Sequence, residues 1–196
     1  MSSTNAPFGL RPAYHPSGLD RATALADGIA SGYSTAILKG QPVKMDTSGT
    51  IVVAAAGDAF MGAFSGVEWT DTTGRRRVSN YWPANTAYQT GSCLAYYYDD
   101  PNIVYEIQGD GSMTQNMVGA ESDLSNTTDG STTTGLSQCT ISTSVVAAGS
   151  GAQMRIINLA PYPGNAWGDS YTIVRATVAK HQYAQIASGG GYPVAI

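Results

Sequence analysis

The sequence predicts an all-β protein: a β-sandwich or jelly-roll-like domain with an extended N-terminal arm and at most one short helix. Helical periodicity is almost absent from the 196 residues, and short apolar or alternating stretches recur instead. Gly, Pro, Asn and Asp interrupt these stretches about every eight to twelve residues, the spacing typical of sandwiches and barrels. Hydrophobic residues make up 42% of the chain and the net charge is only −4, which favours a folded core over disorder.

Two parts are expected along the chain, an extended arm over residues 1–30 and a single β-rich domain over residues 31–196. The arm mixes proline and glycine with Phe8, Leu10 and Tyr14. These apolar side chains need cover that the arm alone does not supply. Either the arm docks on a neighbouring protein surface, or it packs back on its own domain.

Turn residues between apolar stretches define the expected strands. Residues 40–42, 46–49 and 57–58 separate the early strands. The turn at 71–74 predicts a β-hairpin, and Pro101 presets the backbone of the turn at 99–102. The strands are expected at 33–39, 43–45, 51–56, 60–69, 75–82, 94–98, 103–108, 154–159, 171–180 and 181–186. In the long strand at 60–69, alternation places Met61, Ala63, Ser65, Val67 and Trp69 on one face.

One short helix is expected after Ser112. Ser112 and Gln115 have the spacing of a capping box, and Gly119 is placed to end the helix. The alanine-rich segment 23–30 has helical propensity, but its glycines leave little room for a helix, so it is expected to be extended. The Ser/Thr/Gly-rich segment 125–135 is expected to be a long loop.

Composition excludes several classes of partner. An acidic chain with 12% charged residues offers no basic face for nucleic acid. The longest apolar run, 51–56, is too short to cross a membrane. No basic and apolar leader precedes Pro7, so we expect no signal peptide and synthesis in the cytoplasm. In that reducing compartment Cys93 and Cys139 are expected to be buried thiols, and a bridge between them requires an oxidising medium.

No catalytic, cofactor or metal site is predicted. Nucleophile elbows, zinc-protease motifs and phosphate loops are absent from the sequence. Of the two histidines, His15 lies in the arm, and His181 is expected to be structural. Two histidines and two scattered cysteines do not have zinc-ligand spacing. We therefore expect a protein that is not an enzyme and carries no cofactor.

Several acidic residues are candidates for a catalytic or calcium site. Asp99, Asp100 and Asp110 lie in predicted turns, and Asp123 and Asp129 lack the spacing of a calcium loop. Glu68 and Glu106, on predicted strands, would form a glycosidase pair only if they faced each other across a cleft.

Two further clusters allow both a functional and a structural interpretation. Arg75 and Arg77 point to the face opposite Arg76 in a strand, where they either meet an acidic partner or protect an edge from aggregation. The tyrosines 96–98 and Trp82 either stack on carbohydrate or form ordinary strand faces.

Several segments resemble the capsid decoration (cement) proteins of tailed bacteriophages. The most specific is Asn-Ala-Pro-Phe-Gly-Leu-Arg-Pro at 5–12. The others are Gly-Gln-Pro-Val at 40–43, Gly-Ala-Phe-Ser-Gly-Val-Glu-Trp at 62–69, Tyr-Trp-Pro at 81–83, Asp-Asp-Pro at 99–101, Tyr-Glu-Ile-Gln at 105–108 and Ala-Pro-Tyr-Pro-Gly-Asn at 160–165. Together these segments span most of the chain.

The resemblance implies a structural virion protein on the outer capsid surface, where it would clamp neighbouring subunits of the major capsid protein. It also implies self-association, as a homodimer or homotrimer at a symmetry axis. Pro7, Phe8, Leu10, Arg11 and Pro12 are the expected contact residues, together with Arg75 and Arg77. The alternative is a carbohydrate- or receptor-binding β module of a phage tail or capsid surface.

Overall fold

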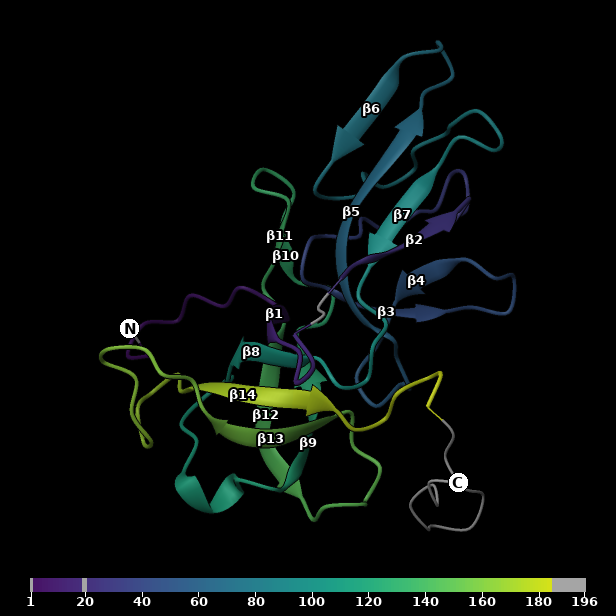
Figure 1. The fold of residues 1–196 in the computed structure, drawn as a ribbon. Helices are drawn as coiled ribbons and strands as arrows, with labels where there is room; N and C mark the ends of the chain where they lie inside the picture. Colours follow the sequence, from purple (N-terminus) through teal and green to yellow (C-terminus); the bar gives the residue numbers. More distant parts are fainter. Residues whose placement is uncertain (1, 19–20, 185–196) are drawn as a thin grey trace.

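Two antiparallel six-stranded sheets account for most of the regular structure (Figure 1). The computed structural model describes residues 2–18 and 21–184. The prediction of an all-β, sandwich-like fold is confirmed, and the described residues contain one 3₁₀ turn, η1 (Gln115–Met117), as their only helical element. No helix among them is long and apolar enough to cross a membrane.

The lower sheet of Figure 1 contains, in spatial order, β1 (Arg11–Tyr14), β8 (Val104–Gln108), β14 (Ile173–Val178), β13 (Met154–Leu159), β9 (Glu121–Ser125) and β12 (Thr140–Val146). The sheet curls until β12 approaches the end of β8. The backbone N–H of Asp110 donates to the carbonyl of Ile141 at 2.9 Å, and the Asp110 carboxylate accepts from the N–H of Thr143 at 2.9 Å. The sheet thereby encloses its own core, which includes Leu10, Tyr105, Ile107, Met154, Ile156 and Val174.

The upper sheet is organised around the long strand β5. Its spatial order is β2 (Thr23–Ala26), β7 (Leu94–Tyr97), β5 (Gly62–Thr70), β3 (Pro42–Met45) and β4 (Ile51–Val53), and β6 (Arg76–Ser79) also pairs with β5. A second core lies on this sheet, where the rings of Trp69 and Trp82 meet edge to face at 5.4 Å. A separate two-stranded ribbon is formed by β10 (Gly130–Ser131) and β11 (Leu136–Ser137).

The strand β5 contributes to both cores because its pairing shifts along its length. Its first residues pair with β3, and its register with β7 slips between Phe64 and Gly66. Val67 therefore lies in the upper core, whereas Ala63 lies in the lower core. Met61, which precedes the first residue of β5, lies in the upper core as well. The expectation that all three share one face was wrong, since strict alternation does not survive such an irregularity.

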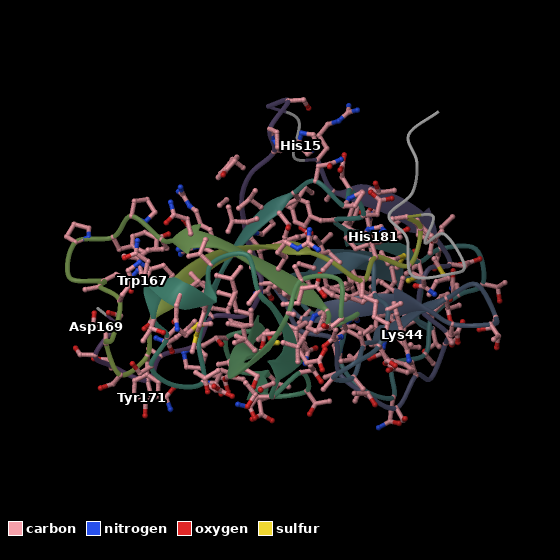
Figure 2. The ribbon with its side chains drawn as sticks, turned by 90° about the horizontal axis from the view of Figure 1, so that it is seen from below. His15, Lys44, Trp167, Asp169, Tyr171 and His181 are labelled. Atoms are coloured by element: carbon pink, nitrogen blue, oxygen red, sulfur yellow. The ribbon has the colours of Figure 1, made fainter. Side chains whose placement is uncertain are left out.

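A second connection between the sheets is made by the chain after β14. The N–H of Phe60 donates to the carbonyl of Lys180 at 3.2 Å, and the N–H of Gln182 donates to the carbonyl of Phe60 at 3.0 Å. The Gln182 side chain then bonds both main-chain groups of Met45 in β3, at 2.7 and 2.8 Å. His181 is buried in this junction, on the same side of the molecule as Lys44 (Figure 2).

Most predicted strands are present. Residues 154–159 form β13, and the turn at 71–74 joins β5 to β6 in the expected hairpin. Strands are also found within 43–45, 51–56, 94–98, 103–108 and 171–180, and segment 23–30 is extended, as expected. The strands β1, β9 and β12 were not predicted.

Three predicted elements are wrong. Residues 33–39 form no strand; Ile37 and Lys39 make only isolated bridges. The capping box is not formed, since η1 begins after Thr114 and has no side-chain cap. In the predicted strand 181–186, His181 makes a single bridge to Phe60, and residues from 185 onward lie outside the described part of the chain.

The first residues of the chain pack on the lower sheet. Leu10 is 1% exposed in its core, and β1 pairs with β8. The Gln108 amide accepts from the N–H of Ala6 and donates to the carbonyl of Thr4, each at 3.0 Å. The carbonyl of Ser2 accepts from Tyr171 at 2.7 Å, at the end of the molecule where Figure 2 labels Trp167 and Asp169. Of the two interpretations of this segment, the structure therefore has the one in which it packs on its own chain.

Candidate contact surface

A row of charged residues crosses the outer face of the lower sheet. Strand register places Arg11 of β1 opposite Glu106 of β8, and Glu106 opposite Arg175 of β14. Tyr105 and Ile107 point into the core, so the side chain of Glu106 points to the other face of the sheet. The sequence pattern of β8 and the pairing of three strands thus determine the position of this row.

Glu106 is only 5% exposed, and its buried carboxylate accepts three hydrogen bonds from other side chains. Arg11 Nη2 lies 2.9 Å from Oε2, and Arg175 Nε lies 3.2 Å from Oε1. The hydroxyl of Tyr162 also donates to Oε2. Burial by itself raises the pKa of Glu106, but these three hydrogen bonds outweigh it and lower the pKa below the usual value.

Aromatic rings frame both guanidinium groups. The Arg11 guanidinium lies 4.5 Å from the centre of the Phe8 ring and 5.4 Å from that of Tyr162. The Arg175 guanidinium lies 5.3 Å from the centre of the Tyr14 ring. Cation–π contacts of this kind hold arginine side chains in fixed planes. We call the set Phe8, Arg11, Tyr14, Glu106, Tyr162 and Arg175 the Glu106 cluster.

The Glu106 cluster keeps hydrogen-bonding capacity for a partner. The side chain of Arg11 is 49% exposed, and its bonds to Glu106 and Tyr162 both use Nη2. No described residue accepts from its Nε or Nη1. Two arginines face one carboxylate, so the cluster carries one excess positive charge on a chain of net charge −4. Such a surface suits a carboxylate or carbonyl group of another molecule.

The predicted contact residues are distributed over three environments. Phe8 and Arg11 belong to the Glu106 cluster. Pro7 and Pro12 are half-buried, and Pro7 lines the polar hollow described below. Leu10 is buried in the lower core, where it packs against its own sheet. Its prediction as a surface contact is therefore wrong. Arg75 and Arg77 lie apart from the cluster, at the start of β6 in the upper sheet.

Sequence reasoning missed Tyr14, Tyr162 and Arg175 as members of the site. One signal was present for Arg175, which is the sole charged residue inside the apolar strand β14. A charge in the middle of such a strand needs a partner.

The two glutamates considered as an acid–base pair lie on different sheets. Glu68 binds Arg76 at 2.7 Å and accepts from the Tyr96 hydroxyl at 2.9 Å. The Tyr96 hydrogen bond is the main cause that lowers the pKa of Glu68, and the pKa of Glu106 is lowered as well. A glycosidase acid needs a raised pKa, so neither carboxyl suits that role.

His15 takes part in a serine–histidine–aspartate contact at the rim of the molecule (Figure 2). Its Nδ1 lies 2.6 Å from Ser17 Oγ, and its Nε2 lies 3.1 Å from Asp100. The N–H of Ser17 also donates to Nδ1, and the N–H of Gly18 donates to the carbonyl of His15. Both backbone donors next to the hydroxyl are thus occupied by the turn, which leaves none of them for an oxyanion.

The aromatic residues considered for sugar stacking are largely in the core. Trp82 is 0% exposed and Tyr97 is buried, while the Tyr96 hydroxyl is bound to Glu68. Cys93 and Cys139 are buried in different cores, so they are not placed to form a bridge.

A polar hollow of about 240 Å³ lies beside the N-terminal segment. Its lining residues are Asn5, Pro7, Asp110, Asn126, Asp129, Gln138 and Thr140. Asp123, weighed with Asp129 as a calcium ligand, instead accepts from the N–H of Gln153 at 3.1 Å. Within residues 2–18 and 21–184 no three His, Cys, Asp or Glu side chains are grouped to hold a metal ion.

Comparison of the chain with protein-family models, with curated proteins and with solved structures finds no match.

Proposed function

We propose that this is a capsid decoration protein of a tailed bacteriophage, a structural virion protein made in the host cytoplasm. It binds the outer surface of the assembled icosahedral capsid and stabilises contacts between subunits of the major capsid protein. One observation carries the proposal. Three segments of the resemblance, 5–12, 105–108 and 160–165, are far apart in sequence yet supply Phe8 with Arg11, Glu106 and Tyr162 to one cluster.

The composition of the Glu106 cluster supports a protein-binding role. Arginine, tyrosine and phenylalanine are the residue types enriched at protein interfaces, and arginine and tyrosine dominate their binding energy. Glu106 and the aromatic rings already hold both guanidinium groups in place. Binding then loses less side-chain entropy than it would with mobile arginines.

Stabilisation of a shell requires no chemical step. A protein that binds only the assembled lattice stabilises it by mass action, and many copies add their effects. Each copy needs roughly 800 Å² of its surface against its neighbours for a stable contact. Assembly as a homodimer or homotrimer would supply part of that area.

The test is binding to empty shells of the same virus, assembled from its major capsid protein. We compare the natural protein with Phe8→Ser and Arg11→Lys by co-sedimentation and by the melting temperature of the shell. Lysine keeps the charge beside Glu106 but loses the planar fork and the ring contacts, so the fold is preserved while the surface changes. We expect both variants to lower occupancy and to remove the gain in shell stability.

Lys39→Ser is the matched control because it removes an exposed charge that has no side-chain partner among the described residues. It should bind shells as the natural protein does. Full occupancy by both Phe8→Ser and Arg11→Lys, with normal melting of the free variants, would show that the Glu106 cluster is not the capsid contact.

A further inference from the structure

We propose that the free edge of β6 binds an extended acidic segment of another protein, which joins the upper sheet as an additional strand. This site lies apart from the Glu106 cluster and does not depend on the proposed function. It rests on the open main-chain groups of β6, on the rigidity of its hairpin and on the charge of its side chains.

The main chain of β6 is paired on one side only. The N–H of Asp71 donates to the carbonyl of Arg75 at 2.9 Å and closes the hairpin. Because hydrogen-bonded pairs alternate in an antiparallel ladder, Arg77 and Ser79 then bond to β5. The N–H and C=O groups of Arg76 and Val78 therefore point to the open edge, and no described residue bonds to them.

The opposite side of β5 supports this assignment. Thr70 is the partner of Arg76 in the register, and its main chain must point away from β6 if the alternation holds. Its carbonyl indeed accepts from the N–H of Gln89 at 2.9 Å, on the side of β7.

The hairpin is held rigidly by one carboxylate. Asp71 accepts from the N–H of Thr73 at 2.9 Å, from the N–H of Arg75 at 3.0 Å and from Arg77 Nε at 2.9 Å. Figure 1 shows β6 at the top of the molecule with no labelled element along its outer side. A rigid, projecting edge is the feature that partners use in β-strand addition.

The charge of the arginines at the β6 edge favours an acidic partner strand. Arg76 is paired with Glu68 and Arg77 with Asp71, whereas Arg75 has no side-chain partner among the described residues. Three arginines in sequence against two carboxylates leave one positive charge along the edge. An acidic strand satisfies it, and glutamates opposite the arginines add favourable cross-strand pairs.

A second copy of this chain is a poor occupant. Antiparallel pairing of two β6 edges brings the arginines of both strands beside one another, which is destabilising. Val78 gives the edge its apolar contact, since its side chain is 76% exposed next to the unpaired main chain. The edge therefore favours a partner strand with a small apolar residue followed by acidic residues.

The test is a ¹H–¹⁵N NMR titration of the full chain with the peptide Thr-Val-Glu-Glu-Glu-Thr, blocked at both ends. The expected result is a set of shifts confined to β6 and its neighbours, with slower amide exchange at Arg76 and Val78. The peptide Thr-Val-Lys-Lys-Lys-Thr should cause none. Absence of shifts in β6 with the acidic peptide overturns the proposal.

Two variants separate main-chain pairing from charge. Val78→Pro removes an outward N–H without touching a β5 bond, and Val78→Thr keeps that N–H. We expect binding to weaken about tenfold in Val78→Pro and to persist in Val78→Thr. Arg75→Glu should weaken it as strongly, and Arg21→Glu, an exposed control with the same change in net charge, should not. If Val78→Pro binds the acidic peptide as tightly as the natural protein does, strand addition is contradicted. If Arg75→Glu also binds as tightly as the natural protein, the arginines only protect the edge.

Discussion

Arg11 Nη2 and Glu106 Oε2 lie 2.9 Å apart across β1 and β8, although 95 positions separate the two residues in the chain. This contact joins the N-terminal segment to the middle of the lower sheet. It also orients the guanidinium that the proposed capsid contact depends on. Glu106 therefore contributes both to the stability of the fold and to the proposed capsid contact, and a change there should affect both.

Glu106→Gln should destabilise the protein by about 2 kcal/mol, since hydrogen bonds to a buried charge are lost while two arginines remain. One of the two carboxylate oxygens becomes an NH₂ group, which cannot accept from Arg11 or Arg175. The free energy of unfolding in urea measures the effect. The matched control is Glu68→Gln, which removes a similar Arg and Tyr partnership on the solvent-exposed face of the upper sheet. A loss in the control as large as in Glu106→Gln would contradict the account.

Leu10→Ala should destabilise the protein by about 3 kcal/mol, the usual cost of a cavity at a fully buried leucine. Leu10 is 1% exposed in the lower core. Leu136→Ala, at a leucine that is 44% exposed, provides the comparison and should change stability little. If Leu10→Ala is as stable as the natural protein, the N-terminal segment is not part of the lower sheet in solution. Deletion of residues 1–17 is expected to disrupt this sheet, so point variants are the better probes of contact.

Stability should fall as the pH drops below about 6.5, because of His181. Its Nδ1 accepts from the N–H groups of Tyr183 and Ala184 at 3.1 and 3.3 Å, so the ring is held neutral. Burial lowers the pKa of His181 from 6.5, despite the nearby Asp99 and Asp100. The unfolded chain therefore takes up a proton that the folded chain resists, and acid favours unfolding.

His181→Asn tests this dependence, since asparagine can accept the same N–H bonds but does not titrate. Between pH 6.5 and pH 5 the free energy of unfolding should decline less in the variant than in the natural protein. Glu106 and Glu121 have lowered pKa values, so their contribution is lost only below about pH 4.5. Parallel pH profiles above pH 5 would exclude His181 as the cause.

Neither cysteine should react in the native protein. Burial raises the pKa of Cys93 to about 11 and raises that of Cys139 as well, and the thiolate is the reactive form. A thiol-reactive dye at pH 8 should label both residues only after unfolding. Oxidation should leave the monomer without an internal bridge, which mass spectrometry detects as an unchanged mass. Rapid native labelling, or a mass lower by two hydrogens, would contradict the placement of the thiols in separate cores.

Local signals predicted the strands that are bounded by clear turns. The turn residues Asp71 and Gly74 predicted the β5–β6 hairpin, and the apolar residues of 154–159 predicted the strand β13. Residues 33–39 have the same apolar pattern, but Ile37 and Leu38 are buried by an irregular segment rather than by a sheet. Burial and strand pairing leave the same pattern in a short sequence, so the pattern cannot separate them.

The Glu106 cluster could be predicted only in part because its contacts are long-range. The strand β12 was not predicted, because its serines and threonines interrupt the apolar alternation of a strand. The side chain of Ser122 bonds to the carbonyls of Ser142 and Ser144 in β12. Phe8 and Arg11 were expected at a contact surface, but no local rule links Arg11 to Tyr162, 151 positions away. Such contacts follow from strand register, which depends on the whole sheet.

The most direct test of the proposed contact is a cryo-electron microscopy reconstruction of empty shells saturated with the protein. We expect density for the protein on the outer surface, with Phe8, Arg11 and Tyr162 against a capsid subunit. Density in which that face is turned to solvent, or shells that remain bare at saturating protein, would contradict it.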